Sequence, residues 1–324
     1  MFSMIFNSEF FFSVFRITAP ILFAALAAVI CEKAGISNIG LEGTMMISAL
    51  FGSLFAYYSS SWFVGLLVAV VMGILVSLLM CFFAFRLKTD IILTGTAINM
   101  IGSGGTIFLV KVITGISEGK QFTSTTSFIT RELQIPDIHI PLIESIPFIG
   151  PVISGHNLLT YISFICVALT WVLLYRTSLG LNIRSVGENP NAASSVGVSV
   201  NKIKYITMII AGILCGLAGA FMSMYYAAGW SLDMVAGRGF IALAAQAMGA
   251  GEPVGAMFAA IIFGLAQALG IKISAMGIDS NLVSPIPYLI TIIGLVIFAI
   301  HEIKKAKHLR SKDILQKQSP NGSK

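Results

Sequence analysis

Stretches of about 20 residues with few or no charged side chains recur along the whole of this sequence. Of its 324 residues, 56% are hydrophobic and only 10% are charged, whereas soluble globular domains carry roughly 25% charged residues. A transmembrane helix needs about 20 predominantly apolar residues, so each stretch is long enough to cross a bilayer. The composition excludes a water-soluble enzyme and predicts an all-α protein that crosses the membrane many times.

Nine membrane segments are expected, and the total of eight to ten spans depends on two of them. Segments 36–58 and 235–250 both open with a glycine-rich turn, so either can be a broken or re-entrant helix. Their shared pattern of glycine followed by an apolar helix is a weak sign of the internal symmetry common in transporters. The predicted segments cover residues 12–31, 36–58, 62–85, 91–113, 158–175, 203–228, 235–250, 253–272 and 284–300.

Positive charge follows the last apolar segment and recurs at one side of the others. The chain carries a formal net charge of +6, and residues 301–324, which include the basic tail at 304–324, account for +5 of it. By the positive-inside rule this tail and the polar loop 176–204 are cytoplasmic. The transmembrane domain is then 1–303, with a long extracellular loop at 115–157. We expect a multi-pass protein of a bacterial cell membrane with a cytoplasmic C-terminus and no affinity for nucleic acid.

No arrangement of residues typical of catalysis or of cofactor binding is found. The four histidines, at positions 139, 156, 301 and 308, are not spaced as a metal-binding pair, and there is no GxxxxGK[ST] phosphate loop. We expect no cofactor, no metal and no enzymatic activity in this chain. If ATP drives the protein, another chain must bind it.

The cytoplasmic loop contains a short helix that is marked at both ends. Asn189 is a good N-cap, Pro190 suits the first helical position, and Gly197 can adopt the left-handed conformation that ends a helix. A helix over 190–196 is only marginally stable alone in water, so it must pack on something. It either packs on its own membrane domain or docks into a cytoplasmic partner.

Glu42 is the most conspicuous charge inside a predicted span. A carboxylate in a membrane segment costs roughly 2.5–3.5 kcal/mol on insertion scales and indicates a functional site by default. If Asn38 caps the helix, however, Glu42 lies in its first turn, where a negative charge complements the helix dipole, and Lys33 is close in sequence. Asn38 and Glu42 are therefore candidates either for a structural anchor or for the substrate pathway.

A polar stripe without charge follows one face of the segment 91–113. Thr96, Asn99, Ser103 and Thr106 occur at helical spacing, which suits hydrogen bonding to a neutral hydroxylated solute and suits contacts between helices equally well. In the second half of the chain, Gln246 is the candidate for lining a path.

Four stretches, at 35–53, 146–164, 178–220 and 237–264, resemble a known family. They are similar to the membrane-spanning permease of nucleoside and simple-sugar ABC importers, in the branch that pairs with basic-membrane-protein-type binding proteins. The most specific is the Gly-Glu-Asn-Pro segment at 187–190, and together the four cover most of the chain.

The resemblance implies a type II-like importer permease that works with an ABC ATPase subunit. It also implies a second, related permease in a heterodimer and an extracellular, lipid-anchored substrate-binding protein. The residues that would couple the permease to the ATPase are Gly187, Glu188, Asn189, Pro190, Ala192 and Ala193.

The expected function is therefore uptake of a neutral nucleoside, with purine nucleosides favoured and ribose or another simple sugar as the alternative. A different class, the ion-coupled secondary transporter, would need ionisable groups within the membrane. Glu42 is the one good candidate for that role in the sequence.

Overall fold

The computed structural model describes residues 7–114, 133–141 and 149–275, together with isolated positions between 289 and 300. This part of the chain is helical apart from one two-stranded sheet. Six of its helices are long and apolar enough to cross a membrane, so the predicted all-α membrane fold is confirmed. Most of the predicted segment 284–300 and the whole basic tail lie outside the described residues.

The first half of the chain forms long helices, two of which run on into π-helical turns. The turn η1 (Phe82–Arg86) extends α4, and η2 (Ile101–Gly105) joins α5 to α6 into one span. The helices are α2 (Ser8–Lys33), α3 (Leu41–Ser59), α4 (Trp62–Cys81), α5 (Ile91–Met100) and α6 (Thr106–Thr114).

The second half combines three long helices with several short elements. The turn η5 (Met222–Tyr226) extends α12. The elements are β1 (Asp137–Ile138), α8 (Ile149–Ile153), β2 (His156–Asn157), α9 (Leu158–Arg176), α10 (Ser178–Glu188), α11 (Pro190–Ser195), α12 (Val200–Phe221), α13 (Arg238–Met248) and α14 (Pro253–Ala275).

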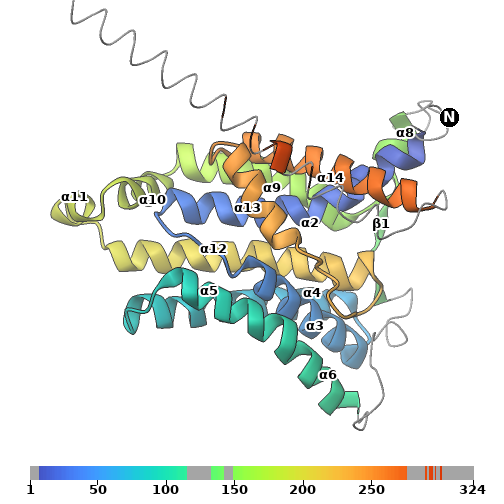
Figure 1. The fold of residues 1–324 in the computed structure, drawn as a ribbon, viewed down its shortest axis with the longest axis horizontal. Helices are drawn as coiled ribbons and strands as arrows, with labels where there is room; N and C mark the ends of the chain where they lie inside the picture. The colour runs from blue at the N-terminus through green and yellow to red at the C-terminus, as the bar shows by residue number, and fades with distance from the viewer. Residues whose placement is uncertain are drawn as a thin grey trace, which may run out of the picture.

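Helix α12 lies between two groups of helices, with α2, α9 and α14 on one side and α3, α4 and α5–α6 on the other (Figure 1). Every residue of α2 from Ile17 to Cys31 is buried. Glycines let the backbones of neighbouring helices touch: a Cβ at Gly73 of α4 would overlap the carbonyl oxygen of Gly212 in α12. Small residues of this kind are typical of helix packing in membranes.

The bundle has two distinct ends. Helices α10 and α11 project from one end, and the strands β1 and β2, which pair antiparallel, lie at the other (Figure 1). We call these the α10–α11 end and the β1–β2 end. The basic residues that follow α4 and those at the start of α12 lie at the α10–α11 end, where the rings of Phe85 and Tyr205 approach to 5.9 Å. This agrees with the predicted side for these residues, and the basic tail of the same prediction lies outside the described residues.

Two predicted segments are shorter than the sequence indicated. Helix α3 begins at Leu41 rather than at residue 36, because residues 34–40 form turns in which Gly35 has a positive φ of 68°. Helix α13 has only 11 residues. Much of the expected extracellular loop 115–157 lies outside the described residues.

Candidate coupling hairpin and transport pathway

Helices α10 and α11 form a hairpin that is capped at each start by a polar side chain. Thr177 accepts a hydrogen bond from the N–H of Gly180 at 3.1 Å. Asn189 accepts hydrogen bonds from the N–H groups of Asn191 and Ala192, both at 3.1 Å. Gly197, with φ of 88°, follows the end of α11. The short helix and the residues that mark its two ends, predicted from the sequence, are confirmed.

The hairpin both rests on the bundle and exposes a surface. Ala193 is buried, whereas Glu188, Asn189, Pro190 and Ala192 are exposed. Val196, just after α11, is 79% exposed. One side of the helix therefore packs on its own domain, as one of the two alternatives predicts. Docking of the exposed side into a cytoplasmic partner stays a prediction.

Gly187 fixes the hairpin to the end of α2. A Cβ at this position would overlap the carbonyl oxygen of Lys33 and lie 3.1 Å from the N–H nitrogen of Gly35. The backbone of α10 thus sits directly on the backbone that leaves α2, and a side chain larger than hydrogen would separate them. A displacement of the hairpin cannot leave the end of α2 unaffected.

Glu42 lies in the first turn of α3, as predicted, and binds the start of another helix. Its Oε1 accepts a hydrogen bond from the N–H of Gly237 at 2.8 Å, and its Oε2 accepts one from Gly239 at 2.6 Å. These N–H groups belong to the N-terminus of α13, whose N-cap residue is a glycine and offers no side chain. The carboxylate therefore satisfies backbone donors left open by the helix start and complements its dipole.

This contact is half-buried within the bundle. Helix α13 runs from Gly237 toward the α10–α11 end, where Gly251 lies beside Lys33. Its 11 residues span about 16 Å, which is too short to cross a ~30 Å hydrocarbon core. Helices α3 and α13 both begin beside Glu42.

Asn38 and Gln246 lie apart from this contact. Asn38 does not cap α3: its Oδ1 accepts a hydrogen bond from the N–H of Gly40 at 3.0 Å, within the preceding turn, and Gly40 is the N-cap. Gln246 is half-buried near the α10–α11 end, and a Cβ at Gly251 would lie 3.7 Å from its Nε2. The structure does not bring Gln246 to the carboxylate of Glu42.

The polar stripe on α5–α6 is divided between two surfaces. The π-helical turn η2 inserts a residue into the helical repeat, so the four side chains do not share one face. Thr96 and Ser103 are exposed and their hydroxyls donate to carbonyls of their own helix, whereas Thr106 is buried. Asn99 faces α3.

Asn99 joins α5 to the start of α3. Its Oδ1 accepts a hydrogen bond from the N–H of Gly43 at 2.8 Å, and its Nδ2 donates to the carbonyl oxygen of Ile39 at 3.0 Å. Both backbone groups lie in or beside the turn that positions Glu42. The side-chain amide of Asn99 therefore holds α5 against the start of α3.

Replacing Asn99 with alanine is expected to destabilise the protein by about 2 kcal/mol or more, because two backbone groups lose their partners. The measurement is the melting temperature of the purified protein in detergent. Thr96→Val is the matched control, since its hydroxyl bonds only to its own helix. Equal melting temperatures for the two variants would contradict this role of Asn99.

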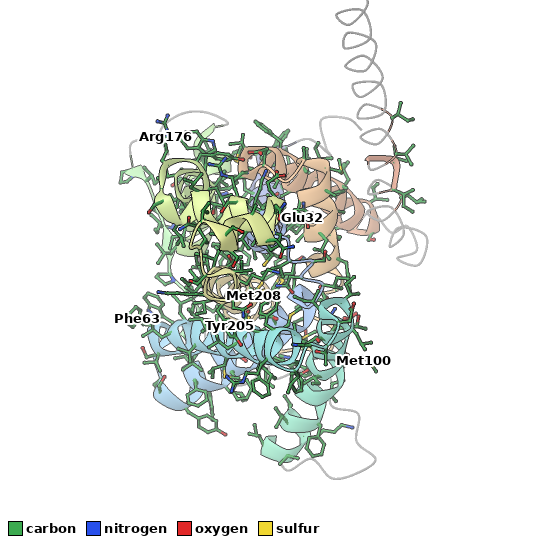
Figure 2. The ribbon with its side chains drawn as sticks, turned by 90° about the vertical axis from the view of Figure 1, so that its left-hand side faces the viewer. Glu32, Phe63, Met100, Arg176, Tyr205 and Met208 are labelled. Carbon is green, nitrogen blue, oxygen red and sulfur yellow. The ribbon has the colours of Figure 1, made fainter. Side chains whose placement is uncertain are left out.

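The outward face of α5–α6 is the most exposed part of the described spans. The span Ile91–Ile113 is the least apolar of the six and also the least buried. Its exposed side chains are mostly apolar, among them Leu93, Phe108 and Met100, which points outward at the edge of the bundle (Figure 2). The exposed hydroxyls of Thr96 and Ser103 interrupt this apolar face beside the π-helical turn.

The described residues hold no metal centre. Within them, His, Cys, Asp and Glu side chains form no group of three or more that could bind a metal ion. The features that the described residues do provide are two helices that begin beside Glu42, an exposed face on α5–α6 and a projecting hairpin.

Comparison with known proteins identifies the family. Residues 10–301 match the family described as "branched-chain amino acid transport system / permease component", and the chain belongs to this permease family. It is 35% identical to the guanosine ABC transporter permease protein NupQ of Bacillus subtilis, over 86% of this chain and 88% of that protein.

Two further relatives have similar coverage. The chain is 31% identical to the nucleoside ABC transporter permease protein NupC of Lactococcus lactis, over 87% of this chain and 89% of that protein. It is 30% identical to the putative glucose ABC transporter permease protein TsgC13 of Haloferax volcanii, over 80% and 75% respectively. The predicted resemblance to nucleoside and sugar permeases is confirmed.

Proposed function

We propose that this chain is the permease subunit of an ATP-driven importer for nucleosides, with purine nucleosides preferred. The observation that carries the proposal is the capped α10–α11 hairpin, which exposes Pro190, Ala192 and Val196 beyond the end of the bundle. A partner ATPase that grips this surface can move the membrane helices, and the chain itself hydrolyses nothing. The choice of nucleoside rests on the similarity to NupQ and NupC.

The assembly contains two permeases, two ATPase domains and an extracellular binding protein. A second, related permease covers the outward face of α5–α6, which is largely exposed in this chain and carries the hydroxyls of Thr96 and Ser103. Thr96 and Ser103 then line the path between the two permeases, together with Gln246. The α10–α11 end is cytoplasmic because the positive charge gathers there, which makes the β1–β2 end the docking side of a lipid-anchored binding protein.

The test is uptake of radiolabelled guanosine by proteoliposomes that contain the assembled transporter. We expect uptake that requires ATP inside and is competed by other purine nucleosides more strongly than by ribose or glucose. An assembly whose ATPase subunit carries an inactive Walker motif is the control. Stronger competition by sugar would favour the simple-sugar alternative, which the similarity to TsgC13 supports. Uptake driven by an ion gradient alone would refute the proposal.

A further inference from the structure

A polar cluster at the α10–α11 end joins three parts of the chain that are distant in sequence: the end of α2, the α9–α10 region and the turn between α13 and α14. Nζ of Lys33, at the end of α2, lies 2.8 Å from Oε1 of Glu252. The hydroxyl of Tyr175, at the end of α9, donates to both carboxylate oxygens of Glu252, at 2.6 Å from Oε1. The guanidinium of Arg184 in α10 lies over the Tyr175 ring, 4.9 Å from its centroid.

Electrostatics keep this carboxylate charged. Burial by itself would raise the pKa of Glu252, but the hydrogen bonds from Lys33 and Tyr175 and the positive charge of Lys33 lower its pKa below the ordinary value. The Lys33 and Glu252 side chains are 23% and 45% exposed. Ion pairs at such partly exposed positions contribute little to stability. If stabilisation were the whole role of the cluster, its removal would change the free energy of unfolding very little.

The position of Glu252 links the hairpin to the pathway helices. It ends the tight turn between α13 and α14, in which Ala250 and Gly251 have positive φ values of 53° and 66°. At its far end, α13 is held by Glu42. On the hairpin side, α10 reaches the cluster twice, through Arg184 over the Tyr175 ring and through Gly187 packed on the carbonyl of Lys33.

We infer that Glu252 is a positioning residue that transmits movement of the α10–α11 hairpin to α13 and α14 through Lys33 and Tyr175. The hairpin is otherwise joined to the bundle by the chain that leaves α9, by the chain that enters α12 and by the packing of α10 and α11 on their neighbours. Through the cluster, a force on α11 also reaches the turn in which α13 ends and α14 starts. This role rests on the proposed coupling of the hairpin to an ATPase.

The test measures nucleoside imported per ATP hydrolysed by the assembled transporter in proteoliposomes. We expect Glu252→Gln to lower this ratio at least about fivefold, the lower end of typical coupling between sites, at unchanged protein abundance. Tyr175→Phe, which removes one hydroxyl, is expected to lower the ratio less. Glu32→Gln is the matched control, because Glu32 is an exposed carboxylate next to Lys33 (Figure 2).

A charge exchange separates transmission from simple packing. Lys33→Glu alone is expected to uncouple the transporter, and adding Glu252→Lys is expected to restore the ratio at least in part. A wild-type ratio in Glu252→Gln, or a double variant no better than Lys33→Glu, would overturn the inference while ATP-driven uptake by the wild type stands. Failure of the wild type to import on ATP would overturn the proposed function as well.

Discussion

Membranes of cells that produce Glu42→Ala are expected to contain several-fold less of the protein than membranes with the wild type. The change leaves the N–H groups of Gly237 and Gly239 without their acceptors, at a half-buried contact between α3 and α13. Each unsatisfied buried donor costs about 1–3 kcal/mol. For two donors, this is a large share of the free energy of unfolding of a typical protein, which is about 5–15 kcal/mol. Losses of this size reduce cellular abundance, which a quantitative immunoblot of the membrane fraction measures.

Two further variants make this result specific. Glu42→Gln keeps one acceptor oxygen, so we expect an intermediate abundance and a melting temperature between those of Glu42→Ala and the wild type. Glu32→Gln removes an exposed carboxylate and should change neither. Normal abundance of Glu42→Ala with abolished uptake would instead assign this carboxylate to the substrate pathway, and normal abundance with normal uptake would contradict both roles.

The double variant Asn189→Ala/Pro190→Gly is expected to reduce ATP-driven uptake by about tenfold or more without lowering abundance. Alanine removes both cap hydrogen bonds of α11, at a cost of about 0.5–2 kcal/mol, and glycine at the next position increases the freedom of the unfolded hairpin. A helix of six residues has little other stability of its own, so the exposed surface offered to the ATPase is lost for much of the time. The measurements are uptake and ATP hydrolysis by the same proteoliposomes.

Two control variants keep the cap of α11. One replaces the capping residue with another that can cap, and the other changes a neighbouring exposed side chain. Asn189→Asp retains a side-chain acceptor and is expected to transport normally. Asn191→Ala alters a neighbouring exposed side chain without touching the cap and should have a small effect. If the double variant imports nucleoside at the wild-type rate, α11 does not couple the permease to its ATPase.

The ends of the short helices could be predicted from the sequence, because capping residues and glycine-rich turns within a few positions determine them. Asn189, Pro190 and Gly197 mark the ends of α11 in the sequence, and the glycine-rich starts of 36–58 and 235–250 indicate helices that are not plain spans. The short length of α13 follows from the turns on both sides of it. These signals act over a few residues, so no knowledge of the packing is needed to interpret them.

Partners distant in sequence were not predictable in this way. Glu42 binds backbone groups 195 and 197 residues further along the chain, and Lys33 binds Glu252, 219 residues away. A sequence does not show which side chain a backbone N–H group will bind, and in the sequence Lys33 lies close to Glu42 rather than to Glu252. The π-helical turn η2, which separates Thr106 from Thr96 and Ser103, was not predicted either, although its sequence Ile-Gly-Ser-Gly-Gly is rich in glycine.

The glycine contacts between helices also bear on which parts can move. Gly73 brings α4 against α12, Gly102 in η2 lies against Gly43 of α3, and Gly264 of α14 lies against Thr18 of α2. Contacts this close leave no room for a side chain larger than hydrogen, so we expect the helices in each of these pairs to move together. Under the proposed function, alternation between outward and inward access then comes from one such group of helices moving against another or against the second permease.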